Sequence, residues 1–145
     1  EKFDKILISP GPGIPEEAGM TKKIIEKFYA KKSILGVCLG HQAIGEVFGG
    51  KLLNLKEVFH GVSTEIEIVV NDPLFKDIPN KFKVGRYHSW IVKDLNDSLV
   101  PLAFDSNKNV MALKHKDHNV WGVQFHPESI LTEHGKAILK NWIKA

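Results

Sequence analysis

The sequence is poor in cysteine and has no long hydrophobic run. Among its 145 residues only Cys38 is a cysteine, so no internal disulfide can form, which favours a reducing, cytoplasmic location. Apolar runs such as Ile6-Leu7-Ile8 are far shorter than the roughly 18 residues that cross a membrane. The formal net charge is only +3 and no stripe of basic and aromatic side chains is present. We therefore expect neither a nucleic acid nor a membrane as a partner.

The first half of the chain alternates short apolar runs with amphipathic stretches. With 43% hydrophobic and 26% charged residues, the composition is that of a soluble globular domain, and the length suits a single one. Apolar runs bounded by turn residues predict strands, and apolar residues at helical spacing predict helices. The expected strands are 5–9, 33–37 and 51–55, and the expected helices are 16–32 and 39–48.

The second half is richer in strands. We expect strands at 64–70, 82–87, 99–105, 110–115 and 120–125, a loop at 71–80 and a closing helix at 134–144. Thr64–Val70 alternates charged and apolar residues, which predicts a half-exposed antiparallel strand. Val120–Phe125 is nearly all apolar, which predicts a central strand covered on both faces. The whole pattern predicts an α/β fold with a mixed sheet.

Gly36-Val37-Cys38-Leu39-Gly40 lies between a predicted buried strand and a predicted helix. The spacing is that of a nucleophile elbow, G-x-S-x-G, with cysteine in place of serine. Both glycines are needed because a Cβ there would collide across the sharp turn. The start of the following helix would favour a thiolate and lower the pKa of Cys38, and the Leu39 N–H would point to a developing oxyanion. The alternative is that Cys38 is a small buried apolar residue.

His126 and Glu128 flank Pro127 after the predicted central strand. Proline favours an extended conformation at the preceding residue, and residues two apart in an extended chain point the same way. Glu128 can then accept a proton from one imidazole nitrogen of His126, leaving the other to face Cys38, which is the logic of a catalytic triad. The alternative is a surface ion pair at the end of a strand.

Ser9-Pro10-Gly11-Pro12-Gly13 follows the first predicted strand. The prolines restrict this loop and the glycines allow close backbone approach, so that beside a nucleophile it can supply a second oxyanion N–H. Taken alone, the segment is better explained as an ordinary turn. His115 and His118 lie in a polar turn without a cysteine or carboxylate cluster, so we expect no metal, and no cofactor either.

Three segments together resemble the class I (triad) glutamine amidotransferases: Pro-Gly-Pro-Gly at 10–13, Gly-x-Cys-x-Gly-His-Gln at 36–42 and Phe-His-Pro-Glu-Ser at 125–129. Within that family, the segments 9–19, 60–61 and 86–89 are most similar to the glutaminase subunits, or component II, of anthranilate synthase and aminodeoxychorismate synthase. The resemblance implies one glutamine amidotransferase type 1 domain over residues 1–145, with a mixed, mostly parallel sheet flanked by helices. Family members begin with a further strand, helix and strand, so we expect this domain to be incomplete at its N-terminus relative to the family.

The resemblance also implies a role for each matching residue. Cys38 would be the nucleophile, His126 the general base and acid, and Glu128 the partner that orients it. Backbone N–H groups of Gly11 and Leu39 would form the oxyanion hole. The expected glutamine contacts are Gly11, Pro12, Gly13, Gln42, Ser89 and Trp90. Two positions depart from the family pattern, Trp90 where leucine is usual and Val62 where lysine is common.

The activity implied is hydrolysis of the glutamine amide through a cysteine thioester. The ammonia would pass to a chorismate-using synthase subunit, component I, which would be the protein partner. We expect the anthranilate synthase role in tryptophan biosynthesis, with the aminodeoxychorismate synthase role in folate biosynthesis as the alternative. A non-catalytic regulatory module on the same fold and a cysteine hydrolase of the γ-glutamyl hydrolase type are further alternatives.

Overall fold

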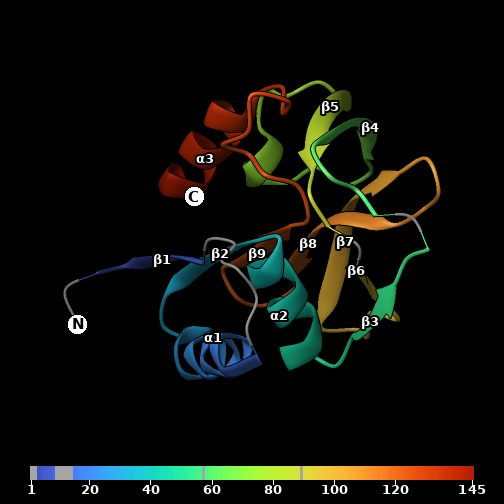
Figure 1. Ribbon diagram of the computed structural model, residues 1–145. Helices are drawn as coiled ribbons and strands as arrows, with labels where there is room; N and C mark the ends of the chain where they lie inside the picture. Colours follow the sequence, from blue (N-terminus) through green and yellow to red (C-terminus); the bar gives the residue numbers. More distant parts are fainter. Residues whose placement is uncertain (1–2, 9–14, 57, 89) are drawn as a thin grey trace.

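Two β-sheets and three helices make up the computed structural model, which describes residues 3–8, 15–56, 58–88 and 90–145 (Figure 1). The helices are α1 (Pro15–Phe28), α2 (Leu39–Val47) and α3 (Gly135–Lys144), with a 3₁₀ turn η1 at Pro73–Phe75. The strands are β1 (Lys5–Ile8), β2 (Ser33–Val37), β3 (Lys51–Asn54), β4 (Val62–Ile68), β5 (Lys81–Arg86), β6 (Trp90–Lys93), β7 (Leu99–Asp105), β8 (Val110–His115) and β9 (Val120–Val123). A small sheet pairs β3 with β6, and the other strands form one sheet in the order β1-β2-β9-β8-β7-β4-β5.

The large sheet is mixed, which confirms the predicted α/β class. Parallel pairing is confined to β1 with β2 and β2 with β9. The other four pairings of this sheet are antiparallel, so parallel pairing is less extensive among the described strands than the resemblance led us to expect. The reason lies in the connections: β7 and β8 are joined by a short turn, which suits antiparallel neighbours, whereas β1 and β2 are joined through the helix α1.

Two apolar cores lie on the two faces of the large sheet. On one face α1 and α2 pack beside each other (Figure 1), and their Ile25 and Ile44 join Ile34 of β2. On the other face Ile138 and Trp142 of α3 pack with Leu35, the next residue of β2. Successive side chains of a strand point to opposite faces, so a strand covered on both sides must be largely apolar. All five residues of β2 and all four of β9 are buried accordingly.

Most predicted elements are found close to their predicted bounds. The half-exposed strand is β4, antiparallel to both of its neighbours with Ile66 buried, and the central strand is β9, between β2 and β8. The predicted helix 16–32 ends at Phe28, where the N–H groups of Lys31 and Lys32 both donate to the Phe28 carbonyl in a closing turn. The strand β6 was not predicted. Among the described residues no helix has the length and apolar character that crossing a membrane requires.

Candidate active site

Cys38 occupies a strained turn between β2 and α2. Its φ angle is 54°, a left-handed conformation that is unusual for a residue with a side chain. A Cβ added at Gly36 would lie 2.5 Å from the carbonyl carbon of Gly40, and one added at Gly40 would lie 2.8 Å from the carbonyl oxygen of Ile8. Only glycine fits at either position, as the elbow pattern predicts. The Cys38 N–H donates to the Val123 carbonyl at 2.8 Å, which ties the turn to β9.

The sulfur of Cys38 is buried beside a side-chain amide. Cys38 is only 5% exposed, and the Nε2 of Gln124 donates to its Sγ at 3.7 Å. Burial and, to a smaller extent, the negative charge of Glu128 raise the pKa of the Cys38 thiol to about 11, against the lowering effects of the Leu39 N–H and of Gln124. The expectation of a lowered pKa is therefore wrong for this state, because loss of hydration outweighs the helix N-terminus.

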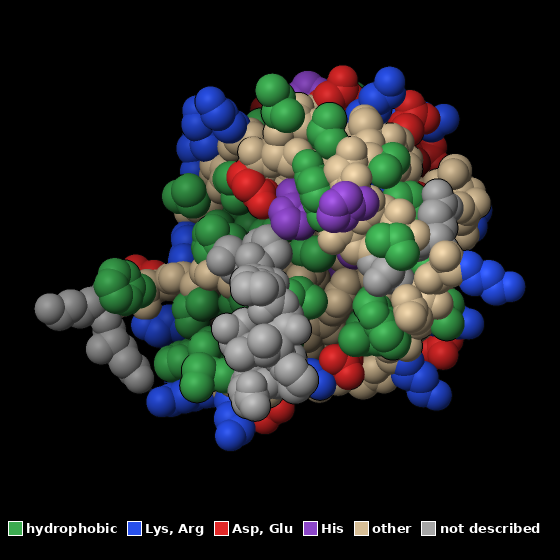
Figure 2. Space-filling view, in the orientation of Figure 1, with side chains coloured by type: hydrophobic (Ala, Val, Ile, Leu, Met, Phe, Trp, Pro, Cys, Tyr) green, Lys and Arg blue, Asp and Glu red, His purple; other side chains and the backbone are tan. Residues whose placement is uncertain are grey.

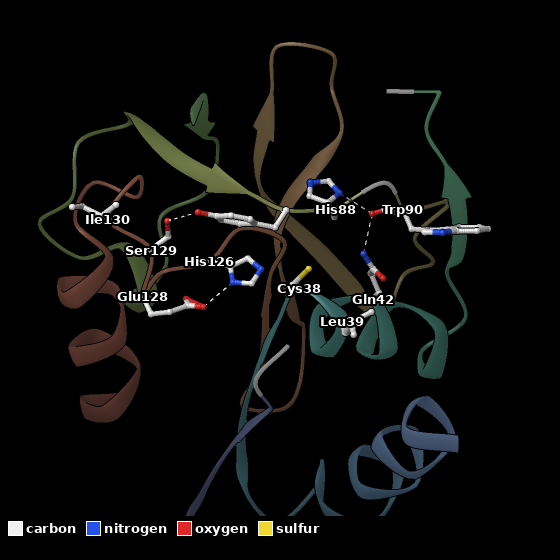
Figure 3. Close-up of a pocket in the computed structure, with 10 residues that line it drawn as sticks. Cys38, Leu39, Gln42, His88, Trp90, His126, Glu128, Ser129 and Ile130 are labelled. Atoms are coloured by element: carbon white, nitrogen blue, oxygen red, sulfur yellow. Dashed lines mark hydrogen bonds and ion pairs between the residues drawn. The ribbon is translucent and has the colours of Figure 1, made fainter. Parts of the chain in front are cut away.

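His126 stands between a carboxylate and the cysteine. Its Nδ1 lies 2.7 Å from Oε1 of Glu128, and since an ionised carboxylate can only accept, Nδ1 carries the hydrogen. Nε2 is then the free basic nitrogen, and Figure 3 shows the ring on the side of the pocket that faces Cys38. The His126 backbone is held at both ends: its N–H donates to Gly85 and its carbonyl accepts from the Thr132 hydroxyl. Among the described interactions no hydrogen bond joins Cys38 to His126 directly.

These side chains line one pocket of about 750 Å³. Its floor holds Cys38, Gln42 and His126, and its rim includes the exposed side chains of Trp90 and Ile130. Figure 2 shows histidine side chains in the middle of this face with apolar side chains beside them. A polar floor below an apolar rim suits a small polar substrate whose entrance a second surface can cover.

Gln42 projects from α2 into the same pocket (Figure 3). Both hydrogens of its amide nitrogen are used, one on the Trp90 carbonyl at 2.9 Å and one on Oε1 of Gln124 at 3.4 Å. Its own carbonyl oxygen has no donor among the described residues. Gln42 can therefore accept a hydrogen bond from a ligand, and its contact to glutamine stays a prediction.

The Trp90 carbonyl is fixed by a second donor. The Nε of Arg86, which can only donate, lies 3.0 Å from Nε2 of His88, so the His88 hydrogen must be on Nδ1, which then donates to Trp90 at 2.9 Å. Burial and the charge of Arg86 lower the pKa of His88 to about 4, so it is neutral. Arg86 in turn is paired with Asp105 at 2.9 Å, both side chains being only 1% exposed.

Four predicted site residues fall outside the described residues. They are Gly11, Pro12 and Gly13 of the proline–glycine loop and Ser89 before β6. The oxyanion contact of Gly11 and the glutamine contacts of these four residues therefore stay predictions. The remaining predicted residues, Cys38, Leu39, Gln42, Trp90, His126 and Glu128, all line the pocket.

Comparison with known proteins identifies the family. The family model described as glutamine amidotransferase class-I matches residues 1–145. A Haemophilus influenzae protein provisionally named anthranilate synthase component II is 47% identical over 99% of this chain and 75% of its own length. This chain belongs to the class I glutamine amidotransferase family.

Two further relatives show the breadth of this glutamine amidotransferase family. Aminodeoxychorismate synthase component 2 of Escherichia coli is 42% identical over 98% of this chain and 76% of its own length. The crystal structure of a Thermoplasma acidophilum protein, provisionally named as one of the subunits of GMP synthase, superposes with a TM-score of 0.89 at 28% identity, over 99% of this chain and 73% of that one.

Sequence reasoning assigned no role to Gln124, although a signal was present. Gln124 precedes His126 by two residues, so in an extended segment both side chains point to the same side.

The other buried histidine near the pocket, His41, is fully buried against Gly122. Burial lowers its pKa to about 3, so this amidotransferase keeps it neutral. Among the described residues no group of three potential metal ligands occurs, and His115 instead accepts the backbone N–H of Asp117.

Gly36→Ala should destabilise the amidotransferase by about 1–3 kcal/mol, because the new methyl group overlaps the α2 backbone and one of the two must shift. The matched control is Gly19→Ala in α1, where nothing lies within 4 Å of the added Cβ and a gain of about 0.5–1 kcal/mol is expected. Urea unfolding of the three proteins measures both. Equal stability of Gly36→Ala and the parent would contradict the tight elbow.

Alkylation of Cys38 by iodoacetamide should accelerate about tenfold per pH unit from pH 7 to pH 10, without a plateau. The thiolate is the reactive species, and with a pKa near 11 its fraction rises over this whole range. Because Cys38 is the sole cysteine, mass spectrometry of the intact protein reads the rate directly. A plateau below pH 9 would show that the helix N-terminus outweighs burial after all.

Proposed function

We propose that this chain is a glutaminase that hydrolyses the side-chain amide of glutamine with Cys38, His126 and Glu128 as its triad. The observation that carries the proposal is the meeting, in one pocket, of an elbow cysteine and a histidine whose far nitrogen is held by a carboxylate. Membership of the amidotransferase family supports the same reaction. If Cys38 were only a small buried residue, and His126 and Glu128 only a surface ion pair, nothing would explain why all three line one pocket.

The first half of the reaction forms a thioester. The sulfur of Cys38 attacks the amide carbon, and the thiol proton moves to Nε2 of His126. Leu39 N–H, with the expected Gly11 N–H, stabilises the negative charge that develops on oxygen. When the tetrahedral intermediate collapses, His126 returns its proton to the leaving nitrogen, the carbon–nitrogen bond breaks, and ammonia departs.

The second half regenerates the enzyme. A water molecule attacks the thioester carbon while His126 Nε2 removes its proton. The carbon–sulfur bond then breaks, the proton passes from His126 to the sulfur, and glutamate is released. The overall reaction converts glutamine and water into glutamate and ammonia.

The raised pKa of Cys38 determines how the proton must move. At neutral pH the free enzyme holds a thiol rather than a thiolate, so attack requires a base at the moment of bond formation. Glu128 stabilises the imidazolium that His126 then becomes, through the 2.7 Å hydrogen bond at Nδ1. A buried thiol also protects the enzyme from unwanted oxidation in the absence of substrate.

Substrate contacts come from both sides of the pocket. The carbonyl oxygen of Gln42 accepts from an N–H group of the substrate. The backbone around Trp90, whose carbonyl is fixed by Gln42 and His88, provides the opposite side. The expected contacts from Gly11, Pro12, Gly13 and Ser89 complete the set.

The ammonia acceptor we propose is a chorismate-using synthase subunit. Relatives named anthranilate synthase component 2 occur in Saccharolobus solfataricus and Pseudomonas aeruginosa, at 43% and 42% identity, which favours the anthranilate role in tryptophan biosynthesis. The Escherichia coli relative at 42% supports the aminodeoxychorismate role as the second candidate. Both use the same glutaminase chemistry, so the pocket is common to them.

Replacing triad residues should separate chemistry from binding. Cys38→Ser should retain the fold and lose more than about 99% of glutaminase activity, because the hydroxyl is a far weaker nucleophile.

Glu128→Gln should lower kcat by about tenfold or more with little change in KM, since the carboxylate acts through His126. Glu65→Gln on the exposed face of β4 is the control. A Glu128→Gln enzyme with normal kcat and only a raised KM would remove Glu128 from the triad.

Component I should accelerate glutamine hydrolysis by this protein, and more so with chorismate present. The two halves of the oxyanion hole lie on separate segments, and a displacement of about 1 Å between them can cost on the order of 10²-fold in rate. Glutamate release is measured for the protein by itself, with each type of component I, and with chorismate added. The type that stimulates identifies the pathway, and equal rates throughout would make the chain a free-standing amidase.

A further inference from the structure

Gln124 is a fully buried polar side chain directly after β9, a strand of buried apolar residues and glycine. Its exposed fraction is 0%, and its neighbours Val123 and Phe125 belong to the core. Burying an amide costs free energy unless its groups find partners. An apolar side chain of similar size would suit this position better if only packing mattered.

The two partners of the Gln124 amide both belong to the proposed site. Its Nε2 donates to Sγ of Cys38 at 3.7 Å, and its Oε1 accepts from Nε2 of Gln42 at 3.4 Å. The backbone of Gln124 is occupied separately, with its N–H donating to Met111 in β8. The side chain therefore connects the nucleophile with the residue expected to bind glutamine, and makes no other described hydrogen bond.

The bond to sulfur is much stronger in one protonation state than in the other. A neutral thiol is a weak acceptor, whereas a thiolate accepts a charge-assisted hydrogen bond. The titratable groups around the pocket give limited help: Glu128 opposes the thiolate, His88 is neutral, and His126 is the proton acceptor. Besides the Leu39 backbone N–H, the Gln124 amide is the described group that lowers the pKa of Cys38.

We propose that Gln124 is a further catalytic residue, whose Nε2 hydrogen stabilises the negative charge on the Cys38 sulfur as the thiol proton leaves for His126. The proposal deepens the proposed glutaminase function and rests on it. An interaction that strengthens as charge develops raises kcat rather than affinity. Through its Oε1, the same amide holds the second hydrogen of Gln42 and so keeps the Gln42 carbonyl available to substrate.

The chain contains two glutamines, Gln42 and Gln124, and they form a matched pair for the test. Gln124→Met keeps the length of the side chain and removes the donor to sulfur. It should slow iodoacetamide alkylation of Cys38 by about three- to tenfold at each pH from 7 to 9. Loss of a hydrogen bond to the charged sulfur lowers the thiolate fraction, and the higher nucleophilicity of the remaining thiolate offsets only part of this loss. We expect kcat for glutamine to fall about tenfold.

Gln42→Met removes the proposed substrate contact and leaves the sulfur's donor in place. It should raise KM for glutamine while alkylation of Cys38 proceeds at the parent rate. Gln124→Asn keeps the amide but withdraws it by one methylene, and should slow alkylation as Gln124→Met does. Thermal unfolding of each variant checks that the fold is kept.

A folded Gln124→Met protein that alkylates at the parent rate would overturn the proposal, as would equal slowing by both methionine variants. If neither Gln124 variant folds, the parent protein still decides: the Gln124 side-chain amide resonances, assigned by comparison with Gln42→Met, should shift when pH is raised toward the thiol pKa. Absence of a shift would also overturn it. Alkylation and resonance shifts require no turnover, so a protein that fails to hydrolyse glutamine would refute the proposed function without deciding this test.

Discussion

The parallel pairing of β2 with β9 is the contact on which the rest of the site depends. The register places Val37 opposite Val123, so the next residues, Cys38 and Gln124, are neighbours at the carboxyl end of both strands. His126 follows Gln124 by two residues. Because parallel strands end at the same edge of a sheet, the proposed nucleophile and the proposed base lie in one pocket although they are far apart in the sequence.

A strained turn at the end of β2 then places Cys38 at the pocket. With φ at 54°, Cys38 bends the chain sharply into α2, and the elbow is held by its N–H bond to Val123 and by the glycine contacts that bring α2 close to β2. Such strain persists only where the surroundings over-determine it. The same packing that holds the elbow also buries the sulfur, so the position that Cys38 takes raises the pKa of its thiol. In the reaction that we propose, a neighbouring base must therefore remove the thiol proton.

Much of this arrangement can be predicted from the sequence because it depends on local rules. Glycines two residues either side of Cys38 predict the elbow, and the i, i+2 spacing of His126 and Glu128 predicts their hydrogen bond. The strand β6 was missed, and it pairs only with β3, outside the large sheet, through a long-range contact that no local pattern of the sequence indicates. The direction of the pKa shift of Cys38 was predicted wrongly. The sequence indicates where the helix begins, but it does not show how far the folded chain excludes water from the sulfur.

Long-range polar contacts are the part that sequence reasoning reaches least. The chain of donors from Arg86 through His88 to the Trp90 carbonyl depends on Asp105, which its position at the end of β7 brings beside Arg86 at the end of β5. These strands are not adjacent, since β4 lies between them. An arginine buried with its carboxylate is costly to desolvate and is retained only when its geometry is well satisfied. Here the pair fixes the tautomer of a histidine beside the pocket, so the most deeply buried charges in the described structure set the orientation of a backbone group at the site. In the reaction that we propose, Gln42 serves binding and Gln124 serves chemistry. The Gln42 amide is held by the Trp90 carbonyl and the Gln124 amide reaches the sulfur of Cys38, so the proposed site depends on contacts between several strands and not on three residues alone.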